Sequence, residues 1–356
     1  MTWHEKSPMR RTRLHLAAGV VLASAWLQAA SVADTNHPNP PPALPDGDRI
    51  RLAEAYRLAA EIGDSLWPGW GRVPFATVLV AGENEYFVRH PHPPAGAASL
   101  GRDDLLGSDV FVRPRTFSPG FLATFPVEGI STVVVGTAEA TASKSPTDWV
   151  VTLLHEHFHQ LQEAQPGFYE KTAALGLARG DTTGMWMLNF PFAYDAAPVQ
   201  AAYAAAAAAL RKALEPGSGA NSAVSAYRER RAALRAAISA DDRRYMDFQL
   251  WKEGVARYTQ LRVARWAAEH YRPAAAFRAL PGYKHASFDA VARDLEAAIS
   301  KELAGQKLAE AKRVVFYPYG AAEALLLDRT HPSWRERYFD DLFTLDPAFE
   351  NKSPSK

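Results

Sequence analysis

The amino-acid sequence predicts an α+β fold, in which a small and mainly antiparallel sheet of about five strands is followed by a large helical part. Residues 74–137 contain short β-rich runs separated by Gly, Pro, Asn and Asp, whereas residues from about 145 to 341 show helical periodicity with few breaks. The chain has 356 residues, of which 47% are hydrophobic and 22% are charged, and this composition is typical of a globular protein.

Residues 1–33 have the pattern of a cleaved signal peptide. Arg10, Arg11 and Arg13 form a basic start, residues 14–30 are apolar, and residues 31–33 (SVA) are the small residues that signal peptidase requires. An N-terminal membrane anchor is the alternative, but the apolar run is short and ends in small residues. We therefore expect export, to the periplasm or out of the cell.

The composition restricts the partners of the chain. There is no cysteine, so we expect stability to come from the core, and from a metal if one is bound, instead of disulfides. The first 33 residues contain four Lys or Arg and one acidic residue, so their removal would change the formal net charge from +1 to −2. A near-neutral chain without a later membrane-length apolar run predicts no nucleic-acid partner, and no membrane partner after signal cleavage.

The residues after the signal are expected to form a linker and then one domain. Residues 34–47 carry five prolines and are typical of an extended linker. The domain is expected to cover residues 48–350 and to begin with a helix from about Asp48. The apolar stripe of this helix extends to Leu66, and residues 67–69 (WPG) end it.

The remaining elements follow from the same periodicities. The expected strands are Phe75–Val80, Glu85–His90, Asp109–Pro114, Phe121–Pro126 and Ile130–Gly136. The expected helices are 146–164, 196–214, 222–238, 240–270, 287–304 and 319–329. The tail from Asn351 is polar and is expected to fray.

One segment carries a catalytic pattern. In residues 146–164, His155 and His159 are four residues apart, so on a helix both imidazoles project from one face and can bind one zinc ion. Glu156 is rotated by about 100° from His155, which places its carboxylate beside a water on that ion. These residues form a His-Glu-x-x-His pattern, in which Glu156 is the candidate general base.

A strand is the alternative for this segment. His155, His157 and His159 would then alternate onto one face and could form a three-histidine zinc site. The capping box of Ser145 and Asp148 and the lack of interior Gly or Pro favour the helix. On a helix, His157 lies on the side away from the metal.

A structural or catalytic zinc ion needs at least one further protein ligand. Glu253 lies 94 residues after His159, in a predicted helix that begins with a second capping box. The small residues Gly254 and Ala256 beside it would let another helix approach the metal helix closely. Glu163, two turns after His155, is the alternative ligand.

The segments 155–160 (HEHFHQ) and 253–256 (EGVA) resemble the gluzincin superfamily of zinc peptidases, the thermolysin and aminopeptidase group. This resemblance implies a zincin-like domain with bound Zn²⁺ and a peptide or protein substrate. Arg257 departs from the pattern, because thermolysin-like enzymes have at this position an acid that orients a ligand histidine. The Gly-x-Met-x-Asn motif of aminopeptidases is also missing, so exopeptidase activity is not supported.

Gluzincins commonly stabilise the oxyanion of the reaction with a tyrosine or histidine from the later helical region. Tyr317 is the candidate for this role, and Tyr319 is the alternative within the same segment. His331 and Arg329 are weaker candidates. A core tyrosine that only packs would have the same local sequence.

The sequence therefore predicts a zinc-dependent hydrolase, as a peptidase in which zinc and Glu156 activate water. Two alternatives remain open, an exported zinc-binding protein without turnover and a zinc amidohydrolase that acts on non-peptide amides. The resemblance also implies that the strand Ile130–Gly136 is an exposed edge that pairs with an extended peptide.

Overall fold

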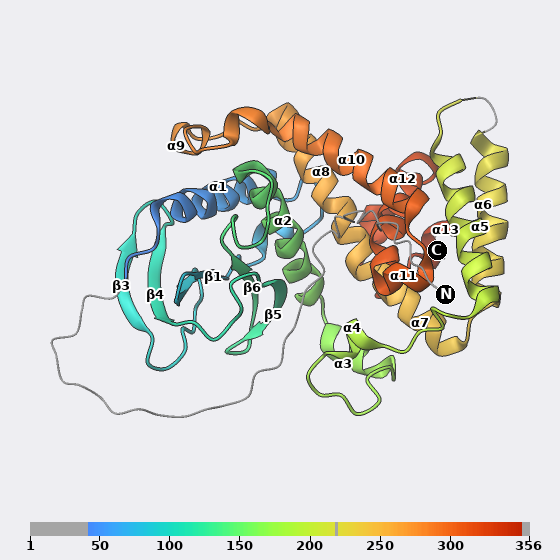
Figure 1. Cartoon of the computed structure of the whole chain (residues 1–356), viewed down its shortest axis with the longest axis horizontal. Helices are drawn as coiled ribbons and strands as arrows, with labels where there is room; N and C mark the ends of the chain where they lie inside the picture. Colours follow the sequence, from blue (N-terminus) through green and yellow to red (C-terminus); the bar gives the residue numbers. More distant parts are fainter. Residues whose placement is uncertain (1–41, 218–219, 351–356) are drawn as a thin grey trace, which may run out of the picture. The chain divides into compact units, whose positions relative to one another are not determined.

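A computed structural model describes residues 42–217 and 220–350, which form an α+β fold with one sheet and a large helical part (Figure 1). This confirms the expected fold class. The expected signal peptide, most of the linker and the polar tail lie outside the described residues. No helix in the described ranges is long and apolar enough to span a bilayer.

The sheet has six strands in the order β3-β4-β2-β1-β6-β5. Their bounds are β1 Thr77–Ala81, β2 Asn84–Val88, β3 Ala98–Asp103, β4 Ser108–Pro114, β5 Leu122–Val127 and β6 Ile130–Gly136. The β1–β6 pair is parallel and the other four pairs are antiparallel, as expected for a mainly antiparallel sheet. β3 was not predicted, because this exposed edge strand has no apolar alternation and its pairing is interrupted between Ser99 and Gly101.

The two faces of the sheet differ in what covers them. Along β1, Leu79 and Ala81 face the main core, whereas Val78 and Val80 face the opposite side, as strand alternation requires. The helices α1 Asp46–Ile62 and α2 Pro146–Glu163 pack on the main-core side. The histidine-bearing helix α2 therefore lies directly on β5 and β6.

The prediction that the strand Ile130–Gly136 is an exposed edge was wrong. β6 is paired on both sides, with β1 and β5, and β5 is the edge strand at this end of the sheet, opposite β3. The Gly136 N–H donates to the Phe121 carbonyl at 2.8 Å, so the alternate residues Leu122 and Thr124 direct their backbone groups outward. Pro126 also directs its backbone away from β6, but it has no N–H to donate. Backbone pairing with another strand is therefore limited to the first part of β5.

The first helix also ends earlier than expected. α1 stops at Ile62, because Gly63 adopts a positive φ of 48° and its N–H closes the helix on the Ala59 carbonyl. Leu66 is buried in the following turn. The other helices are α3 Phe168–Ala174, α4 Trp186–Asn189, α5 Ala197–Leu214, α6 Ala220–Ala236, α7 Ala240–Gln249, α8 Val255–His270, α9 Ala275–Arg278, α10 Phe288–Gly305, α11 Leu308–Ala311, α12 Phe316–Thr330 and α13 Asp346–Phe349.

The expected helix 240–270 contains a π-helical turn. Residues Leu250–Gly254 widen the helix between α7 and α8 without breaking it. A π turn inserts a residue into the helical repeat and rotates the side chains that follow it, and such turns are frequent at functional sites. Glu253 lies on this turn.

A glycine pair brings α12 against the π turn. A Cβ built on Gly320 would lie 2.7 Å from the Gly254 Cα and 2.8 Å from the Leu250 carbonyl oxygen, distances that no side chain tolerates. Gly254 was expected to allow close approach to the histidine helix, and this prediction was wrong. The helix that Gly254 allows to approach closely is α12. Without side chains at these two positions, the backbones can touch where the helices cross.

We predict that Gly320→Ala lowers the free energy of unfolding by about 1–3 kcal/mol, because the added methyl group forces the two backbones apart. Urea denaturation followed by circular dichroism measures this change. Gly305→Ala is the matched control, since that glycine is helical and its Cβ would meet nothing within 4 Å. Equal stability of the two variants would contradict the role of the glycine contact.

Candidate metal centre

The local sequence places both histidines on a well-capped helix. Ser145 accepts a hydrogen bond from the Asp148 N–H at 3.0 Å, and the Asp148 carboxylate accepts one from the Lys144 N–H at 3.0 Å. The helix then continues unbroken through His155 and His159, which excludes the strand alternative. The two imidazoles are buried on one face, with ring centroids 5.0 Å apart.

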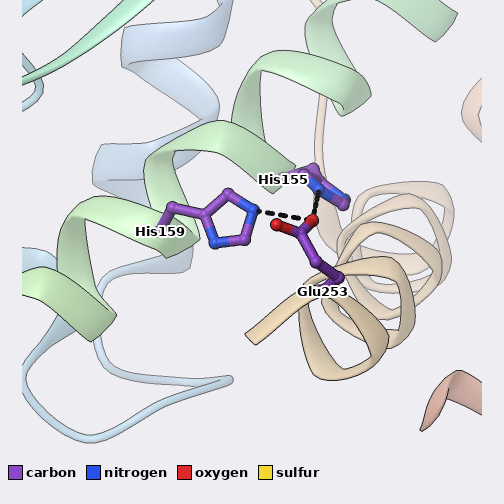
Figure 2. A group of neighbouring side chains, drawn as sticks. All are labelled: His155, His159 and Glu253. Atoms are coloured by element: carbon purple, nitrogen blue, oxygen red, sulfur yellow. Dashed lines mark ion pairs between the residues drawn. The ribbon is translucent and has the colours of Figure 1, made fainter. Parts of the chain in front are cut away.

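Glu253 meets both histidines, as the sequence predicted. Its Oε2 atom is 3.5 Å from His159 Nε2 and 4.0 Å from His155 Nε2 (Figure 2). Candidate ligand atoms of the three residues all lie within 4.8 Å of one another. A tetrahedral ion with ligands at about 2.1 Å needs ligand atoms roughly 3.4 Å apart, so small side-chain rotations would fit one ion between these groups.

Gln162 fixes the orientation of His159. Its Oε1 atom is 2.7 Å from His159 Nδ1, so the imidazole donates from Nδ1 to Gln162 and its Nε2 atom is directed at Glu253. The Gln162 amide nitrogen donates to the carbonyls of Trp251 and Lys252 at 3.0 and 3.1 Å. One side chain therefore joins the histidine helix to the π turn that carries Glu253.

This contact supplies a histidine-orienting group that the sequence analysis did not find. Arg257, at the position where thermolysin-like enzymes have an acid, instead donates to Gln260 at 3.0 Å. Gln162 could have been suggested from its position three residues after His159, on an adjacent turn of the helix. His155 has no corresponding partner within the described ranges, where its Nδ1 atom is buried without a hydrogen bond.

The charges of the three residues are coupled. Burial and the neighbouring His159 lower the pKa of His155 to about 3, so its imidazole is neutral and free to act as a ligand. Burial opposes ionisation of Glu253, but the facing His159 outweighs it and holds the pKa of Glu253 below its ordinary value. Glu253 in turn raises the pKa of His159 against burial. His159 and Glu253 thus form an ion pair, in which a bound cation would take the place of the proton on His159.

Glu156 lies next to this group but is not part of it. Its side chain is buried, and its Oε2 atom accepts a hydrogen bond of 2.9 Å from Thr124 Oγ1, which also donates to the Glu156 backbone carbonyl. Burial raises the pKa of Glu156 above its ordinary value, although His159 acts against this shift. Thr124 on β5 was not identified from the sequence, where nothing connects it to the helix.

Glu163 is used elsewhere. Its carboxylate accepts hydrogen bonds from Ser131 at 2.6 Å and Tyr169 at 3.1 Å, and it pairs with the buried Lys252 at 3.4 Å. It is absent from the group of candidate ligands found among the described residues. This placement favours Glu253 over Glu163 as the third ligand.

His157 points away from the candidate centre, as expected for a helix. Its ring stacks on Phe75 with centroids 3.8 Å apart, and its Nδ1 atom is 2.8 Å from Gln160 Oε1. Gln160 then donates to the carbonyls of Ala76 and Ser131 in the sheet. These contacts anchor α2 on the sheet.

The two candidate tyrosines, Tyr317 and Tyr319, have different neighbours in the structure. Tyr317 lies near Glu253, and burial together with this carboxylate raises the pKa of the Tyr317 phenol. The Tyr319 hydroxyl instead contacts the Tyr227 hydroxyl at 3.2 Å, in a buried cluster with Glu323. Of the two, only Tyr317 is placed to reach a substrate at the candidate centre.

The weaker candidates lie away from Glu253. Arg329 donates to the Leu214 carbonyl at 2.5 Å, and His331 caps the end of α12. His331 also lines a cavity of about 310 Å³ with Trp334, and a second cavity of about 430 Å³ lies between α5 and the end of α10. Neither cavity includes a member of the candidate metal centre.

No family model, curated protein or solved structure matches this chain. The placement of the side chains is therefore the basis for a functional proposal. The membership of His155, His159 and Glu253 in one group is a structural finding, whereas their role as metal ligands stays a prediction.

We predict that Gln162→Leu weakens zinc binding by about 10–100-fold, because His159 loses the acceptor that fixes its tautomer and ring orientation. Competition with a fluorescent zinc chelator measures the dissociation constant. Gln165→Leu is the control, since Gln165 follows the same helix and its amide donates to the Leu161 carbonyl at 2.8 Å and to no other group among the described residues. Equal affinities of the two variants would exclude an orienting role for Gln162.

Proposed function

We propose that this protein is a zinc-dependent peptidase with His155, His159 and Glu253 as metal ligands and Glu156 as general base. The observation that carries the proposal is the meeting of Glu253 with both histidines, although 94 residues separate it from His159. Glu156 lies beside this group with its carboxylate outside it, as a general base requires.

The donor set fits zinc better than the other common divalent ions. Two imidazole nitrogens and one carboxylate oxygen are typical of catalytic zinc, whereas magnesium and calcium prefer sites made only of oxygen. Zinc bound there supplies Lewis acidity, which polarises a carbonyl group and lowers the pKa of a water molecule.

Glu156 is suited to move protons in this site. A carboxyl group with a raised pKa can accept a proton from attacking water and later donate it to a leaving amine near neutral pH. The Thr124 hydroxyl holds one oxygen of the Glu156 carboxylate, which leaves the other oxygen available. The burial and raised pKa of Glu156 support turnover over zinc binding alone, because a binding site has no need for such a group.

Tyr317 is proposed to stabilise the oxyanion. A neutral phenol can donate a hydrogen bond to a developing negative charge, and the raised pKa of Tyr317 keeps it protonated. The Tyr317 oxygen accepts a hydrogen bond from Arg313 at 2.8 Å, so its own proton can be donated to the substrate.

The open edge of β5 is proposed to bind an extended peptide. The outward backbone groups of Leu122 and Thr124 can pair with a substrate strand, and Thr124 is also the residue that holds Glu156. A peptide paired with this edge would therefore run past the general base. A zinc amidohydrolase acting on non-peptide amides would have no use for this strand, but it shares the rest of the site.

The expected export also remains part of the proposal. It rests on the basic start and apolar run of residues 1–33, which are typical of a signal peptide. A periplasmic or secreted peptidase would meet peptide substrates after signal cleavage.

We predict that the mature protein binds about one zinc ion per chain, and that His159→Ala and Glu253→Ala each lower zinc occupancy, because each removes one of three ligands. Plasma emission spectrometry after gentle purification measures the metal. His92→Ala is the control, since this exposed histidine lies in a loop outside the group. A parent protein that neither carries zinc nor takes it up on titration would overturn the proposal.

We predict that Glu156→Gln retains zinc but lowers peptide cleavage by about 10²–10⁴-fold, because the variant keeps the shape of the side chain and loses the proton acceptor. Mass spectrometry of a mixed peptide library measures cleavage, and metal analysis runs in parallel. His159→Ala is the comparison, because it should lose zinc and activity together. Unchanged cleavage by Glu156→Gln would show that the activity belongs to another site. A zinc-loaded parent without any cleavage would favour the binding protein.

A further inference from the structure

Arg313 is a half-buried cation beside the candidate metal centre. It lies in the 3-10 turn Lys312–Val315 that leads into α12. Its Nη1 atom donates to the Tyr317 hydroxyl at 2.8 Å, and its guanidinium lies 5.7 Å from the centroid of the Tyr317 ring. A Cβ on Gly254 would lie 3.2 Å from the Phe316 carbonyl oxygen, so the turn of α12 that holds Tyr317 packs against the residue that follows Glu253. The Glu253 carboxylate accordingly raises the pKa of Tyr317.

No carboxylate of the described residues forms a direct ion pair with Arg313. Other partly buried arginines of the helical part differ in this respect. Arg231 pairs with Glu323 at 2.7 Å, and Arg235 forms a two-bond ion pair with Asp247. An unpaired charge is costly to bury, so a guanidinium without a carboxylate partner is a group that an external anion can satisfy.

The groups around Arg313 do not neutralise it. The phenols of Tyr194 and Tyr245 lie near it, but burial raises the pKa of both, that of Tyr245 to about 12. They are therefore neutral near physiological pH. Burial acts to lower the pKa of Arg313, but Tyr317 and then the Glu253 carboxylate raise it overall. A zinc ion would take up the charge of that carboxylate.

The backbone holds Arg313 in this place at a conformational cost. Lys312, immediately before it, has a φ of 48°, which is unfavourable for a residue with a side chain. Such conformations persist where the surrounding structure enforces them, and they cluster at sites of function. The Lys312 side chain itself is exposed.

We propose that Arg313 binds a carboxylate of the substrate, so that the enzyme selects peptides with a free carboxylate close to the scissile bond. This inference rests on the proposed function, because it assigns a substrate class to the same site. A planar guanidinium can hold both oxygens of a carboxylate, a geometry that neutral amides do not offer. The carboxylate can come from the C-terminus of the peptide or from an acidic side chain.

A binding experiment tests the inference without turnover. Zinc-loaded mature protein is titrated by calorimetry with N-acetylphenylalanine, with its C-terminal amide, and with N-acetylglutamate α-amide. We expect Arg313→Gln to weaken binding of the matching carboxylate by about 10–100-fold and to leave the neutral amide unchanged. Arg313→Lys should recover part of the affinity, because the charge remains while the two-bond geometry is lost.

The two acidic ligands identify the source of the carboxylate. If Arg313→Gln weakens the binding of N-acetylphenylalanine, Arg313 recognises a C-terminal carboxylate. If it weakens the binding of N-acetylglutamate α-amide, Arg313 recognises an acidic side chain. Lys312→Gln is the matched control, because it removes one positive charge from the same turn at an exposed side chain. Equal weakening by Lys312→Gln, or equal binding of acids and amide by the parent, would overturn the inference.

A kinetic experiment separates substrate recognition from oxyanion stabilisation. With peptides that differ only in a free or amidated carboxylate, Arg313→Gln should raise KM for the free acid by about 10–100-fold, with a smaller effect on kcat. A loss of kcat of equal size on both peptides would assign Arg313 to the oxyanion and contradict the inference. If the parent cleaves no peptide but binds carboxylates through Arg313, the peptidase proposal fails, and Arg313 remains a carboxylate-binding residue of a binding protein.

Discussion

The candidate centre depends on the amide of Gln162. A π-helical turn disturbs the regular hydrogen bonds of a helix, and buried carbonyls left without partners are costly. Gln162 satisfies the carbonyls of Trp251 and Lys252, and the Tyr338 hydroxyl adds a second bond of 2.5 Å to the Trp251 carbonyl. The same amide orients His159 through its oxygen. One interaction thus stabilises the turn that carries one candidate ligand and directs another.

The charged groups of the candidate centre are buried and interact strongly with one another. His155, Glu156 and His159 are 7%, 6% and 3% exposed, so their charges are poorly solvated and respond strongly to one another. The pair of Glu253 and His159 and the pair of Glu163 and Lys252 lie side by side on the π turn. Glu163 thereby neutralises the lysine next to Glu253, which leaves the Glu253 carboxylate available to the histidines.

The contact between Gly254 and Gly320 extends this arrangement to α12. Because the two backbones touch, Tyr317, one turn before Gly320, lies near Glu253, and Arg313 donates a hydrogen bond to Tyr317. On the opposite side, Thr124 on β5 reaches Glu156. The sheet therefore holds Glu156 through Thr124, whereas Tyr317 and Arg313 approach the centre from α12 and the turn before it.

The sequence by itself determined the elements whose signals are local. The periodicity and caps of α2, the spacing of His155 and His159, and the order of sheet and helices were all predicted, because each depends on residues that are neighbours in the chain. Glu253 was predicted from its place in a capped downstream helix beside small residues, and the resemblance to gluzincins agreed with it. The sequence did not reveal β3, since an exposed edge strand needs no apolar alternation.

The tertiary structure decided the relations between distant residues. It made β5 the edge instead of β6, because strand order follows from the parallel β1–β6 pair, which no local pattern encodes. It also separated Tyr317 from Tyr319 and placed Arg313 near Glu253, because the crossing of α12 over the π turn sets which side of α12 faces the centre. Local sequence fixes which groups share one helix face, but the packing of helices selects the face that meets the site.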